Sequence, residues 1–485
     1  MDRAKKRSIR DSTQFITSPQ VAPLYDRRII TDIDNIRWEK VPPTAPLSHL
    51  NSIIKFDISP SPNALTCLQD TLLLATWSLK EVLPSGEVKN IPQASIEVLY
   101  DSDNLETGEI KFKDDTNMVC VEPGSPLIAF QNVLVSIGDC PLPPASNNLN
   151  HYSAYMSFLF DSTPEARNTT LKEYSLFAVK DAGQHEATDP RPSTTNKSLS
   201  FIYSKVKDSK TVETISPMAG TPLSGFNRAF PPNTSISVTL DRLRPTLYVL
   251  SNLKSNNRFF EIVFDSIHLL VKRIELPSPS LSAYMSRMAR SPIHFQYRHN
   301  RMVPHEIPMN TVSIDIPIGQ GSDELPSLLR FGFVRRKAFL GSYDECAFKF
   351  LTTDLRNIRI KESDSTISSE LSFYSLAEKT SSDLDSLTFL ATTGPLTYAH
   401  FMKHGYQIDK NQFNAGFALM KIDLSKAKVF DENYEDPDLI SSPRTDKISL
   451  TFEWSQKTKM NYTLVMMEVY DKSIHLFKDG KVALE

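Results

Sequence analysis

Three histidines in one short segment are the nearest approach to a metal site in this sequence. His294, His299 and His305 are spaced five and six residues apart, among the charged residues Arg298, Arg301 and Glu306. A zinc ion needs its histidine ligands to converge within about 2 Å, which one extended segment cannot achieve without a tight turn. We therefore predict a strand or loop with surface histidines. The alternative is a cluster of Arg298, His299 and Arg301 that faces a polyanion.

Two runs of basic residues have the charge to contact anions. Arg335, Arg336 and Lys337 are consecutive, but their apolar neighbours place the segment in a core, which favours a solvent-facing strand edge or loop over a dedicated binding patch. The second run opens the chain and can be a contact to packaged nucleic acid, a nuclear-import signal, a tether to a neighbouring subunit or a solvated flexible tail. It consists of Arg3, Lys5, Lys6, Arg7 and Arg10, against the single acid Asp2.

Motifs of catalysis and cofactor binding are missing from the sequence. It has no G-x-x-x-x-G-K-[ST], G-x-G-x-x-G, H-E-x-x-H or G-x-S-x-G pattern, and its 15 glycines leave few loops that could cradle a phosphate. We therefore expect no enzyme, no cofactor and no bound metal. The net charge of −3 also excludes a polycation for nucleic acid, so any such contact has to sit in a local patch.

Length and cysteine usage set the broad class of the protein. A chain of 485 residues exceeds what one hydrophobic core usually supports, so two domains are expected, and 40% hydrophobic residues are ample for their cores. The four cysteines, Cys67, Cys120, Cys140 and Cys346, lie far apart and form no C-x-x-C pair. The sequence also opens without an apolar signal segment and contains no apolar run of about 18 residues. We therefore predict folding in a reducing intracellular compartment and no membrane span.

A strand–turn–helix pattern occurs twice in the sequence. In Asn132–Phe160 and again in Asn357–Thr380, alternating apolar residues predict a strand, and apolar residues at helical spacing follow after a polar turn. The helical positions are Leu149, Tyr152, Met156 and Leu159 in the first copy and Leu371, Phe373, Tyr374 and Leu376 in the second. We interpret Tyr152 and Tyr374 as core residues with a hydroxyl at the tip. The separation of about 220 residues is too long for a solenoid and fits two tandem domains of similar fold.

These patterns divide the chain into four parts. Residues 1–45 form a basic, Pro-rich arm without the apolar periodicity needed to join a core; residues 46–276 form a first domain with a long polar insertion at about 166–233; residues 277–290 form a connecting helix; and residues 291–482 form a second domain. Many short alternating strands and few helices predict an all-β fold of two tandem jelly-roll sandwiches, a double jelly roll with short helices and long inserted loops.

Two segments of the first domain carry more specific expectations. Leu72, Leu74 and Thr76 are expected in a more fully buried strand in the middle of the sandwich. Asp181–Ser198, within the insertion, is too polar to be buried. We expect it to project outward as part of a tower or to clasp a neighbouring subunit.

Three stretches of the second domain resemble a known protein family. They run from Leu325 to Tyr343, from Asn411 to Leu424 and from Lys447 to Val482. They are similar to the C-terminal half of the major capsid proteins of polintons (Mavericks) and adintoviruses, which belong to the double jelly-roll lineage that includes the adenovirus hexon. The resemblance covers roughly residues 258–482; in the first domain only the opening strands and Asn132–Phe160 fit it.

The resemblance implies a major capsid protein of an icosahedral DNA virus or of a virus-like integrated element. It implies homotrimers that serve as pseudo-hexameric capsomers and a capsid lattice with penton and minor capsid proteins. In such a shell the basic arm would reach packaged DNA or a neighbouring subunit. The protein would then reside in the virion after assembly inside the host cell, with the nucleus as one candidate compartment. The internal repeat favours such a trimer independently, because three chains present six similar sandwiches around a threefold axis.

Two other classes of protein stay open on the sequence. A domesticated two-sandwich module that binds glycan or peptide would share the fold and would not assemble. A cupin-type enzyme is disfavoured, because no plausible set of His and Glu ligands falls within one sandwich. Assembly separates the three classes: a capsid subunit forms a discrete oligomer, a binding module stays monomeric, and an enzyme carries stoichiometric metal.

Overall fold

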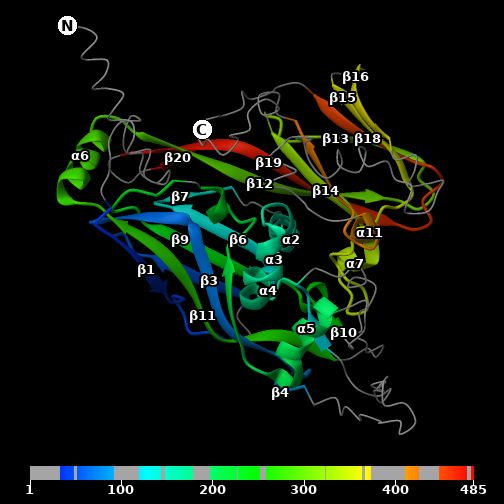
Figure 1. Cartoon of the computed structure of the whole chain (residues 1–485), viewed down its shortest axis with the longest axis horizontal. Helices are drawn as coiled ribbons and strands as arrows, with labels where there is room; N and C mark the ends of the chain where they lie inside the picture. The colour runs from blue at the N-terminus through cyan, green and yellow to red at the C-terminus, as the bar shows by residue number, and fades with distance from the viewer. Residues whose placement is uncertain are drawn as a thin grey trace.

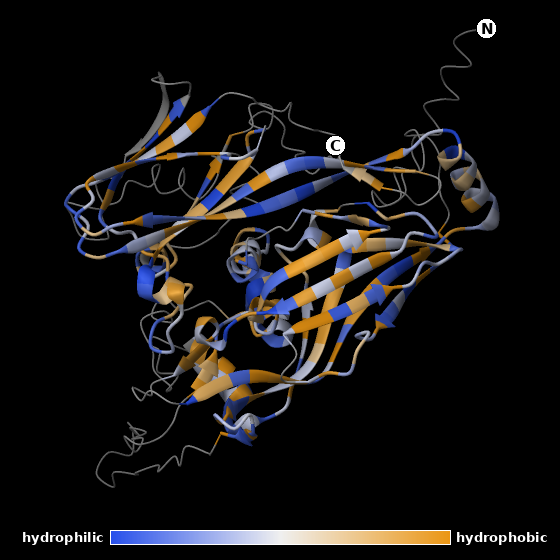
Figure 2. Cartoon of the chain, turned by 180° about the vertical axis from the view of Figure 1, so that it is seen from behind, coloured by the Kyte–Doolittle hydropathy of each residue, from blue (hydrophilic) through white to orange (hydrophobic). Residues whose placement is uncertain are grey.

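The computed structural model places the two halves of the chain in two β-sandwiches, with helices of the first half packed between them (Figure 1). Hydrophobic and polar residues alternate along many of the strands (Figure 2). The structure describes residues 33–48, 52–91, 119–143, 148–178, 197–226, 228–251, 258–322, 324–362, 366–372, 410–424, 447–477 and 482–484.

The first sandwich consists of two antiparallel sheets, which we name sheet A and sheet B. Sheet A contains, in spatial order, β1 (Asn35–Val41), β11 (Phe259–Glu275), β3 (Ala64–Val82) and β8 (Val212–Pro217), with β4 (Val88–Asn90) also paired to β3. Sheet B contains β2 (Ile53–Ile58), β9 (Ile236–Arg242), β6 (Phe130–Ile137) and β7 (Cys140–Pro141). Alternate residues of β2 and β9 are buried, because successive side chains of a strand point to opposite faces and only one face covers the core.

The second sandwich consists of two further antiparallel sheets, sheet D and sheet E. Sheet D contains β12 (Ile293–Ile307), β19 (Tyr462–Leu476), β14 (Leu328–Arg335) and β17 (Leu419–Asp423), with β20 (Val482–Leu484) beside β19. Sheet E contains β13 (Ser313–Pro317), β18 (Ile448–Trp454), β15 (Leu355–Glu362) and β16 (Thr366–Ser372). In the core between them, Phe331 and Phe333 meet the ring of Phe452 edge to face, with ring centroids 5.7 and 5.5 Å apart.

Both sandwiches have the same strand order. When the main strands of either sandwich are numbered along the chain, one sheet has the order 1-8-3-6 and the other 2-7-4-5. Eight strands in this double Greek-key order form a jelly roll. The predicted all-β fold of two tandem jelly rolls is therefore confirmed, and β6 and β15, which begin the two copies of the sequence repeat, occupy the same place in their sandwiches.

Helices and short elements fill the connections between the strands. Helix α6 (Ser278–Met288) links the two sandwiches where a connecting helix is predicted, and it buries Tyr284 and Met288. The other elements are sheet C, which pairs β5 (Val119–Val121) with β10 (Val249–Ser251); the helices α2 (Asn150–Phe160), α3 (Pro164–Asn168), α4 (Thr170–Ser175), α5 (Lys197–Val206), α7 (Arg336–Leu340) and α11 (Lys410–Asn414); and the 3-10 helices η2 (Leu127–Ala129), η4 (Lys207–Ser209), η5 (Pro222–Gly225) and η6 (Pro245–Leu247).

Part of the predicted arm belongs to the first sandwich. Strand β1 lies within residues 1–45 and pairs along its whole length with β11. Its Glu39 accepts a hydrogen bond from the buried guanidinium of Arg273 at 2.7 Å, which fixes the strand to the sheet. The expectation that the arm stays out of the core up to residue 45 is therefore wrong for Asn35–Val41.

The predicted polar insertion at about 166–233 contains regular structure. It holds α4, α5, η5 and the strand β8, which pairs with β3 from Leu72 to Trp77 and completes sheet A. The sequence of this segment predicts a loop because many Ser and Thr residues separate its apolar residues. The predicted tower or clasp at Asp181–Ser198 lies almost wholly outside the described residues.

Two further expectations differ from the structure. In the second copy of the repeat, Leu371 lies in β16 and pairs with Ile358 of β15, so the predicted helix does not begin there; Tyr374 and the rest of that helix lie outside the described residues. In β3, Leu73, Ala75 and Trp77 are buried, whereas Leu72, Leu74 and Thr76 are only half-buried on the outer face of sheet A. The strand is therefore not fully buried there.

Candidate assembly surfaces

Helix α2 forms the joint between the two sandwiches. All of its residues, Asn150–Phe160, are buried, which is the environment of a helix packed on every side. Tyr152 is a core residue as predicted: its hydroxyl donates a hydrogen bond to the Ala347 carbonyl at 3.0 Å, and its ring packs against Phe348 with centroids 5.3 Å apart. The helix therefore ties the first sandwich to the chain that follows β14.

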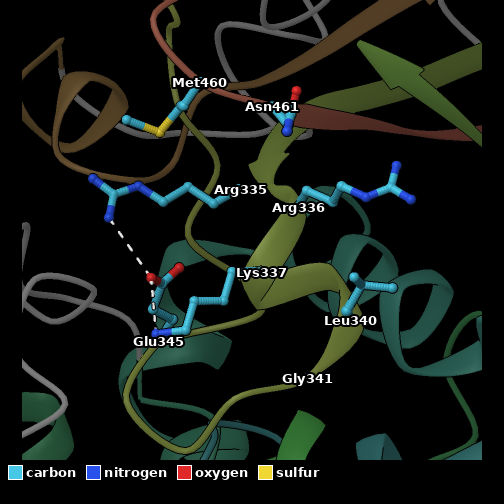
Figure 3. A pocket seen from close by; sticks show the side chains of 8 residues that line it. All are labelled: Arg335, Arg336, Lys337, Leu340, Gly341, Glu345, Met460 and Asn461. Carbon is cyan, nitrogen blue, oxygen red and sulfur yellow. Dashed lines mark ion pairs between the residues drawn. The ribbon is translucent and has the colours of Figure 1, made fainter. Parts of the chain in front are cut away.

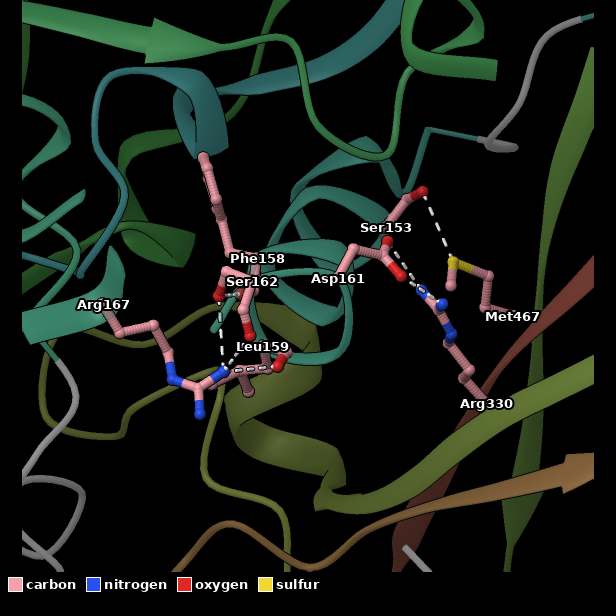
Figure 4. Close-up of polar contacts among 8 residues, drawn as sticks. All are labelled: Ser153, Phe158, Leu159, Asp161, Ser162, Arg167, Arg330 and Met467. Carbon is pink, nitrogen blue, oxygen red and sulfur yellow. Dashed lines mark hydrogen bonds and ion pairs between the residues drawn. The ribbon is translucent and has the colours of Figure 1, made fainter. Parts of the chain in front are cut away.

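An ion pair at the end of α2 links the helix to sheet D (Figure 4). The Nη1 of Arg330, on β14, donates to Asp161 Oδ2 at 3.0 Å, and its Nη2 donates to Asp161 Oδ1. The side chain of Asp161 is 52% exposed; partial desolvation raises its pKa, but the charge and hydrogen bonds of Arg330, helped by Arg298 and Lys421, outweigh this and hold that pKa below its usual value. Sequence reasoning missed this pair; the available signal was one arginine inside the apolar run Leu328–Val334.

A loop of the first sandwich packs against the first half of β12. The rings of Phe226 and Tyr297 stack with centroids 4.9 Å apart, and those of Phe230 and Phe295 stack at 4.6 Å. Phe226 and Tyr297 also form an isolated antiparallel β-bridge. Gly225 lies so close to Arg298 that a Cβ atom on it would be 2.2 Å from the Arg298 carbonyl oxygen.

The basic run Arg335–Lys337 lines an open cavity of about 500 Å³ (Figure 3). Arg335 ends β14, and Arg336 and Lys337 begin α7, so the run faces solvent as predicted, although it lies at a strand end and in a helix. Each cation has a carboxylate partner: Arg335 approaches Glu345 at 4.0 Å, Lys337 approaches Asp344 at 2.8 Å, and Arg336 pairs with Glu306. These pairs reduce the attraction for an external anion.

The three predicted histidines lie on β12 and do not converge. His294 is exposed, with its ring centroid 4.1 Å from that of His475 on β19. His299 is buried, so the prediction of a surface residue is wrong there; burial, helped by the charges of Lys472 and Arg301, lowers its pKa to about 4. Arg298 points to the opposite, exposed side of the strand, so the alternative cluster facing a polyanion does not form. Among the described residues, no three His, Cys, Asp or Glu side chains are placed to hold a metal ion.

A buried carboxyl group lies where the two halves of the chain meet. Glu122 is 2% exposed, and it is hydrogen-bonded to the thiol of Cys346 from the segment after α7. Burial raises the pKa of Glu122 to about 8, although the hydrogen bond with Cys346 opposes the rise. None of the four cysteines, all of which lie in the described ranges, forms a disulfide.

Some predicted features fall outside the residues that the structure describes. The arm residues Arg3, Lys5, Lys6, Arg7 and Arg10 are among them, so a contact with DNA or a neighbouring subunit stays a prediction. Within the described part, no helix is long and apolar enough to cross a membrane.

Solved structures match this fold over nearly the whole chain. A cryo-EM structure of the Sputnik virophage matches with a TM-score of 0.54 at 10% identity, over 97% of this chain and 92% of the other. PBCV-1 VP54, fitted into a reconstruction of Sputnik, matches with a TM-score of 0.51 at 9% identity, over 94% of this chain and 97% of that one. A quasi-atomic model of the PBCV-1 virus capsid matches with a TM-score of 0.50 at 9% identity, with the same coverage.

Comparisons of the amino-acid sequence itself find no match. No model of a protein family matches the chain, and no curated protein matches it. At about 10% identity the structural likeness shows the fold alone.

Proposed function

We propose that this chain is the major capsid protein of an icosahedral DNA virus or of a virus-like integrated element, and that its trimers serve as pseudo-hexameric capsomers. One observation carries the proposal: two jelly rolls of identical strand order follow each other in one chain. The likeness of the whole chain to structures from the Sputnik virophage and the PBCV-1 capsid supports it. The chain then acts by packing and binding, without catalysis or a cofactor.

The geometry suits a ring of three chains. Two similar sandwiches joined side by side give three chains an approximate sixfold outline, which fills the hexagonal positions of an icosahedral lattice. The joint itself is rigid, because the buried helix α2 and the pair Arg330–Asp161 hold it in place. A rigid joint fixes the angle between the sandwiches, which the ring needs in order to close.

The resemblance of the second domain to polinton and adintovirus proteins supports a more specific proposal about the family, the partners and the location of the protein. The chain would belong to that branch of the double jelly-roll lineage and would assemble with penton and minor capsid proteins. It would contact packaged DNA through Arg3, Lys5, Lys6, Arg7 and Arg10 and reside in the virion. Assembly would take place inside the host cell, with the nucleus as a candidate compartment.

Light scattering on the purified full chain tests the proposal. We expect a mass of about three 54.8-kDa subunits that persists on dilution, because a closed ring buries far more than the roughly 1,600 Å² of a standard interface. Negative-stain microscopy should show hexagonal particles, sheets or shells. A chain that is monomeric or dimeric without denaturant would contradict the proposal and favour the two-sandwich binding module for glycan or peptide.

Deletion of the arm tests the proposed contact of the arm with packaged DNA. Removing residues 1–32 should leave the melting temperature unchanged and impair particle formation, because these residues precede β1. Removing residues 1–45 should instead cost about 3–5 kcal/mol of unfolding free energy, because it takes away Glu39 and leaves the buried Arg273 without its carboxylate. Normal particle formation after deletion of residues 1–32 would contradict the proposed role of the arm in assembly.

A further inference from the structure

Two histidines from different strands lie side by side near one end of sheet D. In the antiparallel pair of β12 and β19, His294 is directly opposite His475, and directly paired residues share a face of the sheet. Their ring centroids are 4.1 Å apart, and the planes of the rings meet at 64°. His294 is exposed and His475 is half-buried, so ions from solvent have access to the pair. The expectation of no bound metal considered the histidines of one segment, whereas the strand register adds a ring from another.

The spacing of the two rings suits a single bound ion. A tetrahedral zinc ion, with Zn–N distances of about 2.0–2.1 Å, holds two histidine nitrogens about 3.3 Å apart. Since the nitrogens lie at the rim of each ring, centroids 4.1 Å apart allow one nitrogen of each ring to reach that separation by rotation of the side chains. Imidazole is a preferred ligand of zinc, copper(II) and nickel(II), whereas calcium and magnesium prefer oxygen ligands. The pair therefore favours a transition-metal ion.

The sheet holds the two histidines in register. Their four sequence neighbours are buried on the opposite face and anchor both strands: Ile293, Phe295, Ile474 and Leu476. On the face of the pair, Gln296 is opposite Ser473, and Ala483 of β20 is opposite His475. None of these three neighbouring positions carries a positive charge that would repel a cation.

We propose that His294 and His475 together bind one divalent transition-metal ion, with zinc as the reference ion. The two imidazoles occupy two of the four tetrahedral positions, and water fills the other two. The ion ties β12, the first strand after helix α6, to the long strand β19. The site is independent of the proposed trimer, because both ligands come from one chain.

Zinc titration of the metal-free full chain, prepared without a histidine tag, tests the site. We expect His294→Gln to lower the zinc affinity at least about 10-fold, because loss of a group that merely supports a metal ligand already costs 10–100-fold. His475→Gln should show the same loss, and the double variant should lose little more, because two ligands of one ion are not additive. His305→Gln is the matched control, since His305 is a half-buried histidine of β12 that pairs with Leu464. Isothermal titration calorimetry measures all four variants.

Urea unfolding with and without zinc gives a second measurement. The two histidines are far apart in the sequence, so unfolding separates them and the ion binds the folded chain. Zinc at about 100 times its dissociation constant should shift the folding equilibrium of the wild type about 100-fold toward the folded state. It should raise the urea midpoint of His305→Gln equally and leave those of His294→Gln and His475→Gln unchanged. Calcium at the same concentration should have no effect on any of them.

The variants also define the results that would overturn the site. Equal zinc affinity in the wild type, His294→Gln and His475→Gln would show that the rings only stack and that zinc binds elsewhere. A zinc-dependent rise of the urea midpoint that persists in His294→Gln would contradict the site in the same way. Either result would leave the proposed capsid function standing, because trimer formation does not depend on this ion.

Discussion

Replacing Gly225 with alanine should cost about 3 kcal/mol of unfolding free energy, at the upper end of the usual effect of overpacking. The added Cβ would lie 2.2 Å from the carbonyl oxygen of Arg298 and 3.2 Å from its carbonyl carbon. Both atoms belong to the backbone of β12, which is paired along its whole length with β19 and cannot move alone. The loop around η5 would have to withdraw from β12 and pull the Phe226 ring off Tyr297.

Urea unfolding of the full chain at a fixed protein concentration measures this effect, since oligomerisation adds to apparent stability. The matched control is Gly86→Ala, in the turn between β3 and β4. Gly86 has a φ of +82°, but no other atom lies within 4 Å of a Cβ added there. Its cost should be the conformational strain alone, about 1 kcal/mol. If Gly225→Ala costs no more than Gly86→Ala, the loop around η5 is not held against β12 as described.

Gly220 provides a second glycine at the same joint. It combines a φ of +69° with a position where a Cβ would lie 2.4 Å from the Ser153 carbonyl oxygen of α2. Gly220→Ala should therefore be at least as destabilising as Gly225→Ala. Because both substitutions disturb the angle between the sandwiches, both should also reduce the trimer fraction in light scattering under conditions where the chain is still folded.

The sequence allowed the architecture to be predicted where both strand alternation and repetition were present. Strands β6 and β15 keep alternating apolar residues in both copies of the repeat, and both occupy the fourth place in their jelly roll. Strand β1 was missed because exposed charges surround Ile36 and Trp38 on an edge strand, so its alternation does not separate apolar from polar residues. Strand β8 was missed because its two buried positions, Thr214 and Ser216, are polar, whereas the apolar Ile215 between them is only half-buried.

The spacing of apolar residues gave a wrong prediction where pairing with a neighbouring strand determines the structure. Leu371 stands at helical spacing with the residues after it, but Thr366–Ser372 pairs with β15, and tertiary pairing outweighs a weak helical preference. The candidate surfaces were harder to predict than the strands, because they depend on residues far apart in sequence. Asp161 and Arg330 are separated by 169 positions, and neither segment contains a pattern that predicts contact with the other.

Glu122→Gln should remove a pH dependence of stability between pH 6.5 and 9. The carboxyl group has a pKa of about 8 in the folded chain, against about 4.5 without burial. The folded state therefore holds a proton that the unfolded state releases, so the unfolding free energy falls as the pH rises from about 4.5 and stops falling above about 8. The whole range corresponds to about 5 kcal/mol, of which about 2 kcal/mol lies above pH 6.5.

The window above pH 6.5 also excludes the buried histidine of helix α2. His151 is buried in α2, and burial, with the charge of Arg244, lowers its pKa to about 3. Its contribution to stability is present above about pH 6.5 and is lost only as the pH falls toward 3. A slope measured from pH 6.5 to 9 therefore reports on Glu122 and not on His151.

Glutamine fits the site because it keeps the shape of the neutral carboxyl group and cannot ionise. In urea unfolding at pH 6.5, 7.5, 8.5 and 9, the wild type should lose about 2 kcal/mol more than Glu122→Gln. Glu87→Gln, whose parent side chain is 62% exposed, should keep the wild-type slope. Equal slopes in wild type and Glu122→Gln would show that Glu122 is ionised in the folded chain. Glu122 and Cys346 join the two halves of the chain. If the wild type loses more trimer at pH 9 than Glu122→Gln does, the proton on Glu122 stabilises the joint that the trimer requires.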